Sequence, residues 1–201
     1  MRSIKMVGVA IVAVLALGAM TAGSASAFTK FVASKTGGQL NGKAINTQKF
    51  KTGGGATVDC TVAEPSGEVT KLEGTEQESS VKYSSCTVSG LGSAEVTLAD
   101  YTFFITPLVS VLNLIHIKAT ALGVECELSV LAGQSFTGIE YENDKSNAEE
   151  IVVKSKVTGI VTDILKSNSS SLCGTAGTEV TNGTYEGEVL VGLSNGSIKV
   201  S

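Results

Sequence analysis

Hydrophobic and polar residues alternate along most of the chain, and the alternation is most regular from Leu122 to Val130. A side-chain period of two residues indicates a β-strand with one buried and one solvated face. Glu125 and Glu127 belong to the solvated face of this strand. The residues predicted to be buried are Leu122, Val124, Cys126, Leu128 and Val130.

Similar short stretches follow one another through the rest of the chain, separated by clusters of Gly, Asn and Ser. The chain contains 23 glycines, two prolines and no tryptophan. This pattern predicts an all-β fold, an antiparallel β-sandwich. The expected strands lie at 57–63, 81–88, 95–105, 109–119, 122–130, 134–142, 151–157 and 184–193.

Two places break the alternation. In 81–88, Val81 and Tyr83 have one parity and the apolar residues after Ser85 have the other, so a β-bulge near Ser84–Ser85 is expected. A second bulge is expected near Thr120, because the parity changes again before residue 122.

Two short sequences predict tight turns. Glu64-Pro-Ser-Gly67 fits a type I turn, with proline at its second position and glycine at its fourth. Asn195-Gly196 fits the type I′ turn of a hairpin, in which Leu193 would face Ile198.

The first 27 residues have the pattern of a secretory signal peptide. Arg2 and Lys5 precede an apolar run at 7–20, and Ala25 and Ala27 form a small-x-small cleavage site. An uncleaved membrane anchor is less favoured, because a span needs about 20 apolar residues. We therefore expect a secreted, extracellular chain that begins at Phe28, forms a single domain over 28–201 and has no membrane span.

The charge of the mature chain argues against two classes of partner. Removal of Arg2 and Lys5 leaves 13 lysines against 19 acidic residues, a net charge of −6, and no arginine. Recognition of phosphate relies on basic side chains. We expect no nucleic-acid partner and no attraction to an anionic membrane surface.

The chain also shows signs of an internal repeat. With a shift of 66 residues, the segment from Val58 to Glu68 matches the segment from Val124 to Gln134, and two shorter similarities follow in the same order. These predict two related β units at 40–112 and 113–201. Chance recurrence of short Val/Thr/Gly motifs is the alternative.

Four cysteines in an exported chain imply two disulfides. The repeat favours pairing within each half, Cys60 with Cys86 and Cys126 with Cys173. A metal site is the weaker alternative, because the chain has no C-x-x-C motif and no zinc-type spacing. We expect no metal and no cofactor.

Residues that could support catalysis have simpler explanations. His116 is the only histidine, and the chain has no Gly-x-Ser-x-Gly motif. The pairs Glu125/Glu127 and Glu186/Glu188 could serve a glycosidase, but strand alternation already explains them as solvated residues. We expect no catalytic residues and a protein that is not an enzyme.

Two further binding signals remain open. The loop 143–150 has oxygen donors at alternate positions, as a calcium site would, but it lacks the central glycine. Asn168, Asn182 and Asn195 begin glycosylation sequons, and two of them are also Asn-Gly turns.

The layout resembles a family of small secreted all-β proteins of high-GC Gram-positive bacteria that have two disulfides and no assigned activity. The motifs that carry the resemblance are Thr36-Gly-Gly38, Val58-Asp-Cys60, Val81-Lys-Tyr83 with Cys86, Ile139-Glu-Tyr141 with Asn143, and Cys173-Gly174 followed by Gly183-Thr-Tyr-Glu-Gly187. The family has no functional residues to transfer, so the resemblance supports the fold class alone.

These observations together favour a secreted, disulfide-stabilised β-sandwich with a binding or structural role at or outside the cell surface. Its partner would be an extracellular or cell-envelope molecule. The alternatives are an extracellular hydrolase with an unrecognised carboxylate site and a calcium- or glycan-binding adhesion module.

Overall fold

The computed structural model describes residues 28–88, 92–169 and 173–201. The expected signal peptide, with Ala25 and Ala27, lies outside the described residues. The described part is all-β and antiparallel, as predicted, with a large sheet packed against a smaller one. Its strands are β1 (Phe31–Ala33), β2 (Gln39–Ala44), β3 (Gln48–Lys51), β4 (Thr57–Glu68), β5 (Glu73–Gly74), β6 (Glu76–Val88), β7 (Gly92–Val96), β8 (Ala99–Phe104), β9 (Leu108–Val111), β10 (Ile115–Ala121), β11 (Val124–Val130), β12 (Ser135–Thr137), β13 (Ile139–Asn143), β14 (Ile151–Ser167), β15 (Thr178–Leu193) and β16 (Ile198–Val200).

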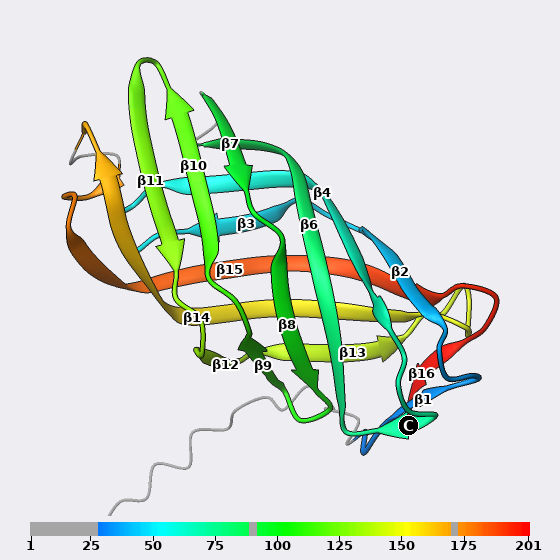
Figure 1. Ribbon diagram of the computed structural model, residues 1–201. Coiled ribbons are helices and arrows are strands. Elements are labelled where there is room, and N and C mark those ends of the chain that lie inside the picture. Colours follow the sequence, from blue (N-terminus) through cyan, green and yellow to red (C-terminus); the bar gives the residue numbers. More distant parts are fainter. Residues whose placement is uncertain (1–27, 89–91, 170–172) are drawn as a thin grey trace, which may run out of the picture.

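The large sheet closes on itself (Figure 1). Hydrogen-bonded neighbours lead from β4 through β6, β7, β10, β11, β14, β15 and β3, and then back to β4. Its two walls therefore face each other across one core, which is the layered arrangement expected of a sandwich. Leu128 of β11 and Ile164 of β14 are opposite each other in adjacent strands and are almost fully buried in this core.

The small sheet covers one end of the closed sheet and joins the two ends of the described chain. Strand β1 pairs with both β16 and β5 (Figure 1). The ring of Phe31 packs edge-on against Tyr141, with centroids 5.2 Å apart. The Asn143 side chain donates to the Val200 carbonyl and accepts from the Val200 amide, both at 2.9 Å. The C-terminal strand is thereby fixed to β13.

The parity change in β6 occurs where the sequence predicted it. Val81 and Cys86 are both buried, Tyr83 faces the interior, and Ser85 between them has a positive φ of 52°. The bulge itself is not formed, because β4 changes parity at the same level and Cys60 stays opposite Cys86. Equal numbers of residues on the two strands preserve the register.

The bulge expected near Thr120 is wrong. Leu122 and Gly123 instead form a two-residue turn with φ values of 50° and 80°, and Ala121 is opposite Val124. Two positive φ values are what a type I′ hairpin turn requires. Leu122 is consequently 83% exposed and does not belong to the buried face of the strand.

The type I turn expected at Glu64-Pro-Ser-Gly67 is also wrong, because β4 runs straight through it. Pro65 lies in the part of β4 between its pairing with β3, which ends at Cys60, and its pairing with β2, which begins at Ser66. The missing N–H of proline therefore costs no ladder hydrogen bond on that side.

The hairpin predicted at Asn195-Gly196 is not formed between β15 and β16. Asn195 has a positive φ of 55°, but β16 pairs with β1 instead. The pairing of β15 with β14 ends at Val191, and Leu193 then forms a single antiparallel bridge with Gly196, so the chain does reverse here but the ladder does not continue into β16. The residues that were expected to pair, Leu193 and Ile198, are nevertheless both buried.

The two predicted repeat units occupy largely separate sectors of the large sheet. Within it, β2–β4 and β6–β9 are contiguous, and so are β10, β11 and β13–β15, whereas β12 pairs with β9 of the first unit. Cys60 lies on β4, beside β3, and Cys126 lies on β11, beside β10. These positions are compatible with a duplication, which stays a prediction.

Candidate binding site

A cavity of about 80 Å³ lies inside the closed sheet, and its lining is almost wholly apolar. A neighbouring void of about 50 Å³ extends toward Cys60, and another of about 40 Å³ lies beneath the small sheet beside Phe31. The three voids share lining residues, so they form one series through the interior. The apolar lining of the largest includes Val81, Phe103, Ile115, Val130, Val153 and Val189.

Four polar side chains meet in this apolar interior. Tyr83 of β6 lies 3.3 Å from the hydroxyl of Tyr101 of β8 and 3.2 Å from the hydroxyl of Tyr185 of β15. The Tyr185 hydroxyl donates to Gln48 Oε1 at 2.6 Å. Gln48 Nε2 donates to the backbone carbonyls of Asn46 and Glu188. We call Gln48, Tyr83, Tyr101 and Tyr185 the interior polar chain.

Each tyrosine hydroxyl in the interior polar chain donates its proton to one defined partner. Gln48 Oε1 can only accept, so Tyr185 must donate to it, and Tyr185 then accepts from Tyr83. Because the Tyr83 proton is used in this way, the contact between Tyr83 and Tyr101 requires Tyr101 to donate. Hydrogen-bond donation within the interior polar chain therefore runs from Tyr101 to Gln48.

The hydroxyls of the interior polar chain stay protonated far into the alkaline range. Burial is the main reason that the pKa values of Tyr83 and Tyr101 lie well above the usual value; the neighbouring Tyr185 raises that of Tyr83 further, and the contact with Tyr83 raises that of Tyr101. Burial likewise raises the pKa of Tyr185. The interior thus offers neutral hydrogen-bonding groups at physiological pH.

Gly187 makes room for Gln48. A Cβ atom at position 187 would lie 2.0 Å from Gln48 Oε1, far inside van der Waals contact. Gln48 is 2% exposed and holds two backbone carbonyls, so it cannot move away without breaking those hydrogen bonds. A glycine at position 187 therefore leaves the space that Gln48 needs to keep its hydrogen bonds.

We expect Gly187→Ala to lower the free energy of unfolding by about 2–3 kcal/mol, because buried polar groups lose their partners. Urea unfolding followed by circular dichroism measures this loss. In the matched cycle with Gln48→Ala, the double variant should lose less than the two single losses combined. Additive losses would show that the clash with Gln48 is not the cause.

The sequence contained only indirect signals for this site. The alternation in 81–88 and 184–193 gives Tyr83 the parity of Val81 and Tyr185 the parity of Val189, yet nothing in the sequence indicates that the two tyrosines converge. Residues 102 positions apart meet only because β6 and β15 lie on facing parts of the closed sheet. Gln48 was not singled out, because a lone glutamine in a weak strand normally faces solvent.

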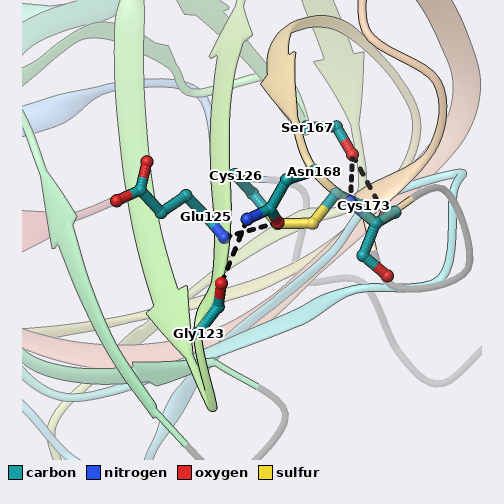
Figure 2. The surroundings of a disulfide bond; sticks show 7 residues. Gly123, Glu125, Cys126, Ser167, Asn168 and Cys173 are labelled. Carbon is teal, nitrogen blue, oxygen red and sulfur yellow. Dashed lines mark hydrogen bonds between the residues drawn. A yellow bond between two sulfur atoms is a disulfide. The ribbon is translucent and has the colours of Figure 1, made fainter.

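The disulfides join Cys60 to Cys86 and Cys126 to Cys173, which are the pairs that the repeat favoured. The first links directly opposite residues of β4 and β6. The second ties β11 to the segment after β14, where Cys173 is fully buried (Figure 2).

The side chain of Asn168 reinforces the second disulfide. Asn168 accepts a hydrogen bond from the Glu125 amide at 2.9 Å and donates to the Gly123 carbonyl at 3.0 Å (Figure 2). Asn168 is the residue directly after β14, so its side chain extends the hydrogen bonding of the β11 backbone past the end of β14. The amide of this sequon asparagine already has a structural role.

His116 lies on the outer wall, opposite Ser129 of β11, and Ser129 is in turn opposite Asp163 of β14. These three residue types form catalytic triads when the histidine lies between the serine and the acid. Here the serine occupies the middle position. Within the described residues, no hydrogen bond joins their side chains, and the buried His116 Nε2 atom has no hydrogen-bond partner.

The two glutamate pairs also lie on the outer wall, as their alternation predicted. Glu125 forms an ion pair with Lys166 at 2.6 Å, and this hydrogen bond lowers the pKa of Glu125. A general acid needs a raised pKa. Glu186 and Glu188 are opposite lysines of β14 and line an outer groove of about 340 Å³ that contains charges of both signs.

The loop 143–150 uses its oxygen atoms internally. Asp144 accepts from the Ser146 hydroxyl and from the Asn147 amide, and these hydrogen bonds lower the pKa of Asp144. Asn143 binds Val200. In the part of the chain that the structure describes, no group of three or more His, Cys, Asp or Glu side chains could hold a metal ion.

Comparisons with known proteins gave no match, whether with family models, with curated proteins or with solved structures. Among the described residues, no helix has the length and apolar character needed to cross a membrane.

Proposed function

We propose that this chain is a secreted, disulfide-stabilised binding protein that holds a small, mainly apolar molecule inside its closed sheet. One observation carries the proposal: an apolar cavity contains a hydrogen-bonded chain of four polar side chains. Binding sites for small molecules combine a mostly hydrophobic lining with a few placed polar groups.

The size of the interior fits a ligand of a few non-hydrogen atoms. An engineered cavity of about 150 Å³ in another protein binds benzene. The central void of about 80 Å³, with its neighbours of about 50 and 40 Å³, provides space of the same order.

Two features support a role outside the cell. The pair of disulfides in the described chain suggests an oxidising environment. The predicted signal peptide and the resemblance to small secreted two-disulfide proteins agree with secretion. We propose that the ligand is taken up outside the cell or at the cell envelope.

Binding is favoured over catalysis as the role of the interior. Its polar groups are neutral phenols and an amide, and their protons stay in place at physiological pH. Catalytic acids and bases need pKa values near the working pH. The hydrolase alternative would depend on a carboxylate site or on a partnered His116 on the outer wall.

The test uses the mature chain and toluene as an apolar probe. We expect toluene to raise the melting temperature, because a ligand that binds only the folded state stabilises it. Val153→Phe, which adds a ring where Val153 lines the central void, should abolish the shift if circular dichroism shows that it folds. No shift with the unaltered protein, or an equal shift with the filled variant, would refute the proposal.

A further inference from the structure

The ligand class argued here rests on the proposed function and follows from the hydrogen bonds of the interior. The interior polar chain has two different ends. At one end, both groups of the Gln48 amide have protein partners: the oxygen accepts from Tyr185, and the nitrogen donates to the carbonyls of Asn46 and Glu188. At the other end is Tyr101, a residue that lines both the central void and the void beside Cys60.

The Tyr101 oxygen has unused capacity to accept. A hydroxyl group has one proton and two lone pairs. The proton is donated to Tyr83, and within the described residues the Tyr101 oxygen accepts no hydrogen bond. The Tyr83 and Tyr185 oxygens, in contrast, each accept one. The Tyr101 end of the interior polar chain therefore offers an unused acceptor on a residue that lines the apolar voids.

A ligand that can only accept would meet a less favourable arrangement. Tyr101 would have to turn its proton away from Tyr83 toward the ligand, which would leave the Tyr83 oxygen without a donor. The Tyr83 hydroxyl cannot donate to Tyr101 instead, because its proton is already donated to Tyr185, which in turn donates to Gln48. The fixed direction of the chain therefore selects for a donor on the ligand.

The lining also bears on the ligand's charge. Every described residue around the three voids is uncharged at physiological pH, with Gln48, Gln77, serines and tyrosines as the only polar members among them. An ion transferred from water into such surroundings loses its hydration without gaining a counter-ion. The interior therefore favours a neutral molecule over a carboxylate or an amine cation.

We propose that the ligand is a neutral, largely apolar molecule that carries a hydrogen-bond donor, such as a hydroxyl group, and that it donates to the Tyr101 oxygen. Tyr101 is then the residue that distinguishes this class from hydrocarbons and from acceptor-only molecules of the same shape.

Three probes of similar shape test this assignment: phenol, which donates and accepts; anisole, which only accepts; and toluene, which does neither. Dissociation constants are measured by calorimetry at pH 7 for the mature chain, for Tyr101→Phe and for the matched control Tyr141→Phe. The Tyr141 hydroxyl donates to the Phe104 carbonyl at 2.8 Å, and Tyr141 lines only the void beneath the small sheet, not the two voids that Tyr101 lines.

We expect Tyr101→Phe to lower the affinity for phenol relative to toluene about tenfold, the scale of one net hydrogen bond. The ratio of anisole to toluene should stay unchanged, and Tyr141→Phe should change neither ratio. If toluene binds but Tyr101→Phe leaves the phenol ratio unchanged, or lowers the anisole ratio equally, the donor assignment is overturned and the proposed function stands. If none of the three probes binds, both are overturned.

Discussion

Above about pH 10, the protein is expected to lose stability steeply and to unfold in one cooperative step. The chain has four tyrosines, Tyr83, Tyr101, Tyr141 and Tyr185, and burial raises the pKa of each in the folded state. In the unfolded chain a tyrosine loses its proton near pH 10. Above that pH the unfolded chain binds fewer protons than the folded one, so stability falls as pH rises.

The size of this effect follows from the number of tyrosines. Between its unfolded and folded pKa values, each tyrosine lowers the free energy of unfolding by about 1.4 kcal/mol per pH unit. All four together therefore lower it by roughly 5–6 kcal/mol per unit. A domain of this size is stable by about 5–15 kcal/mol. Between one and three pH units above 10 should therefore suffice to unfold it.

Tyrosinate absorbance at 295 nm and circular dichroism, recorded together against pH, measure this behaviour. We expect both signals to change in the same narrow interval above pH 10. Tyr141→Phe should make the fall in stability shallower, because one proton fewer is linked to folding. A gradual rise in absorbance centred near pH 10 with unchanged circular dichroism would contradict the prediction.

Loss of the disulfide between Cys126 and Cys173 is expected to have the second-largest effect. Its cysteines are 47 residues apart, and in the chain-entropy model closure of such a loop contributes about 4 kcal/mol. The bond also holds the segment after β14, where Cys173 is fully buried. The double variant Cys126→Ala with Cys173→Ala should therefore unfold at a much lower urea concentration.

The matched control is the double variant Cys60→Ala with Cys86→Ala. These cysteines are 26 residues apart, which corresponds to about 3.5 kcal/mol in the same model, and their strands remain paired along β4 and β6. We expect amide exchange near Asn168 to accelerate in the first variant and to stay slow in the second. Equal exchange in the two variants would show that the second disulfide does not hold this segment.

The alternation of residues was sufficient to predict the antiparallel class and most strands. Strand β11 lies within the stretch predicted at 122–130, and β13 and β14 overlap those predicted at 134–142 and 151–157, although β14 continues to Ser167. The parity change at Ser84–Ser85 was also predictable, because apolar residues on both sides must reach one core. These features depend on local periodicity alone.

The errors in the turns share one cause. Pro65 and the Asn195-Gly196 pair are strong local turn signals, and in both cases the pairing of distant strands decided otherwise. Pro65 is tolerated within β4 because one side of the strand lacks a partner there. Asn195 does lie in a tight turn, with Leu193 bridged to Gly196, but the hairpin goes no further because β16 pairs with β1.

The candidate site likewise depends on the tertiary structure, because strand pairing brings its residues together. Alternation determined that Tyr83 and Tyr185 face inward, and the four cysteines determined which stretches are cross-linked. Closure of the sheet decided that two tyrosines from distant strands meet, that Gln48 is buried between them, and that Tyr101 ends the chain in a void. Periodicity indicates which face of a strand is buried, whereas the neighbours across the core depend on the order in which strands pair around the whole sheet.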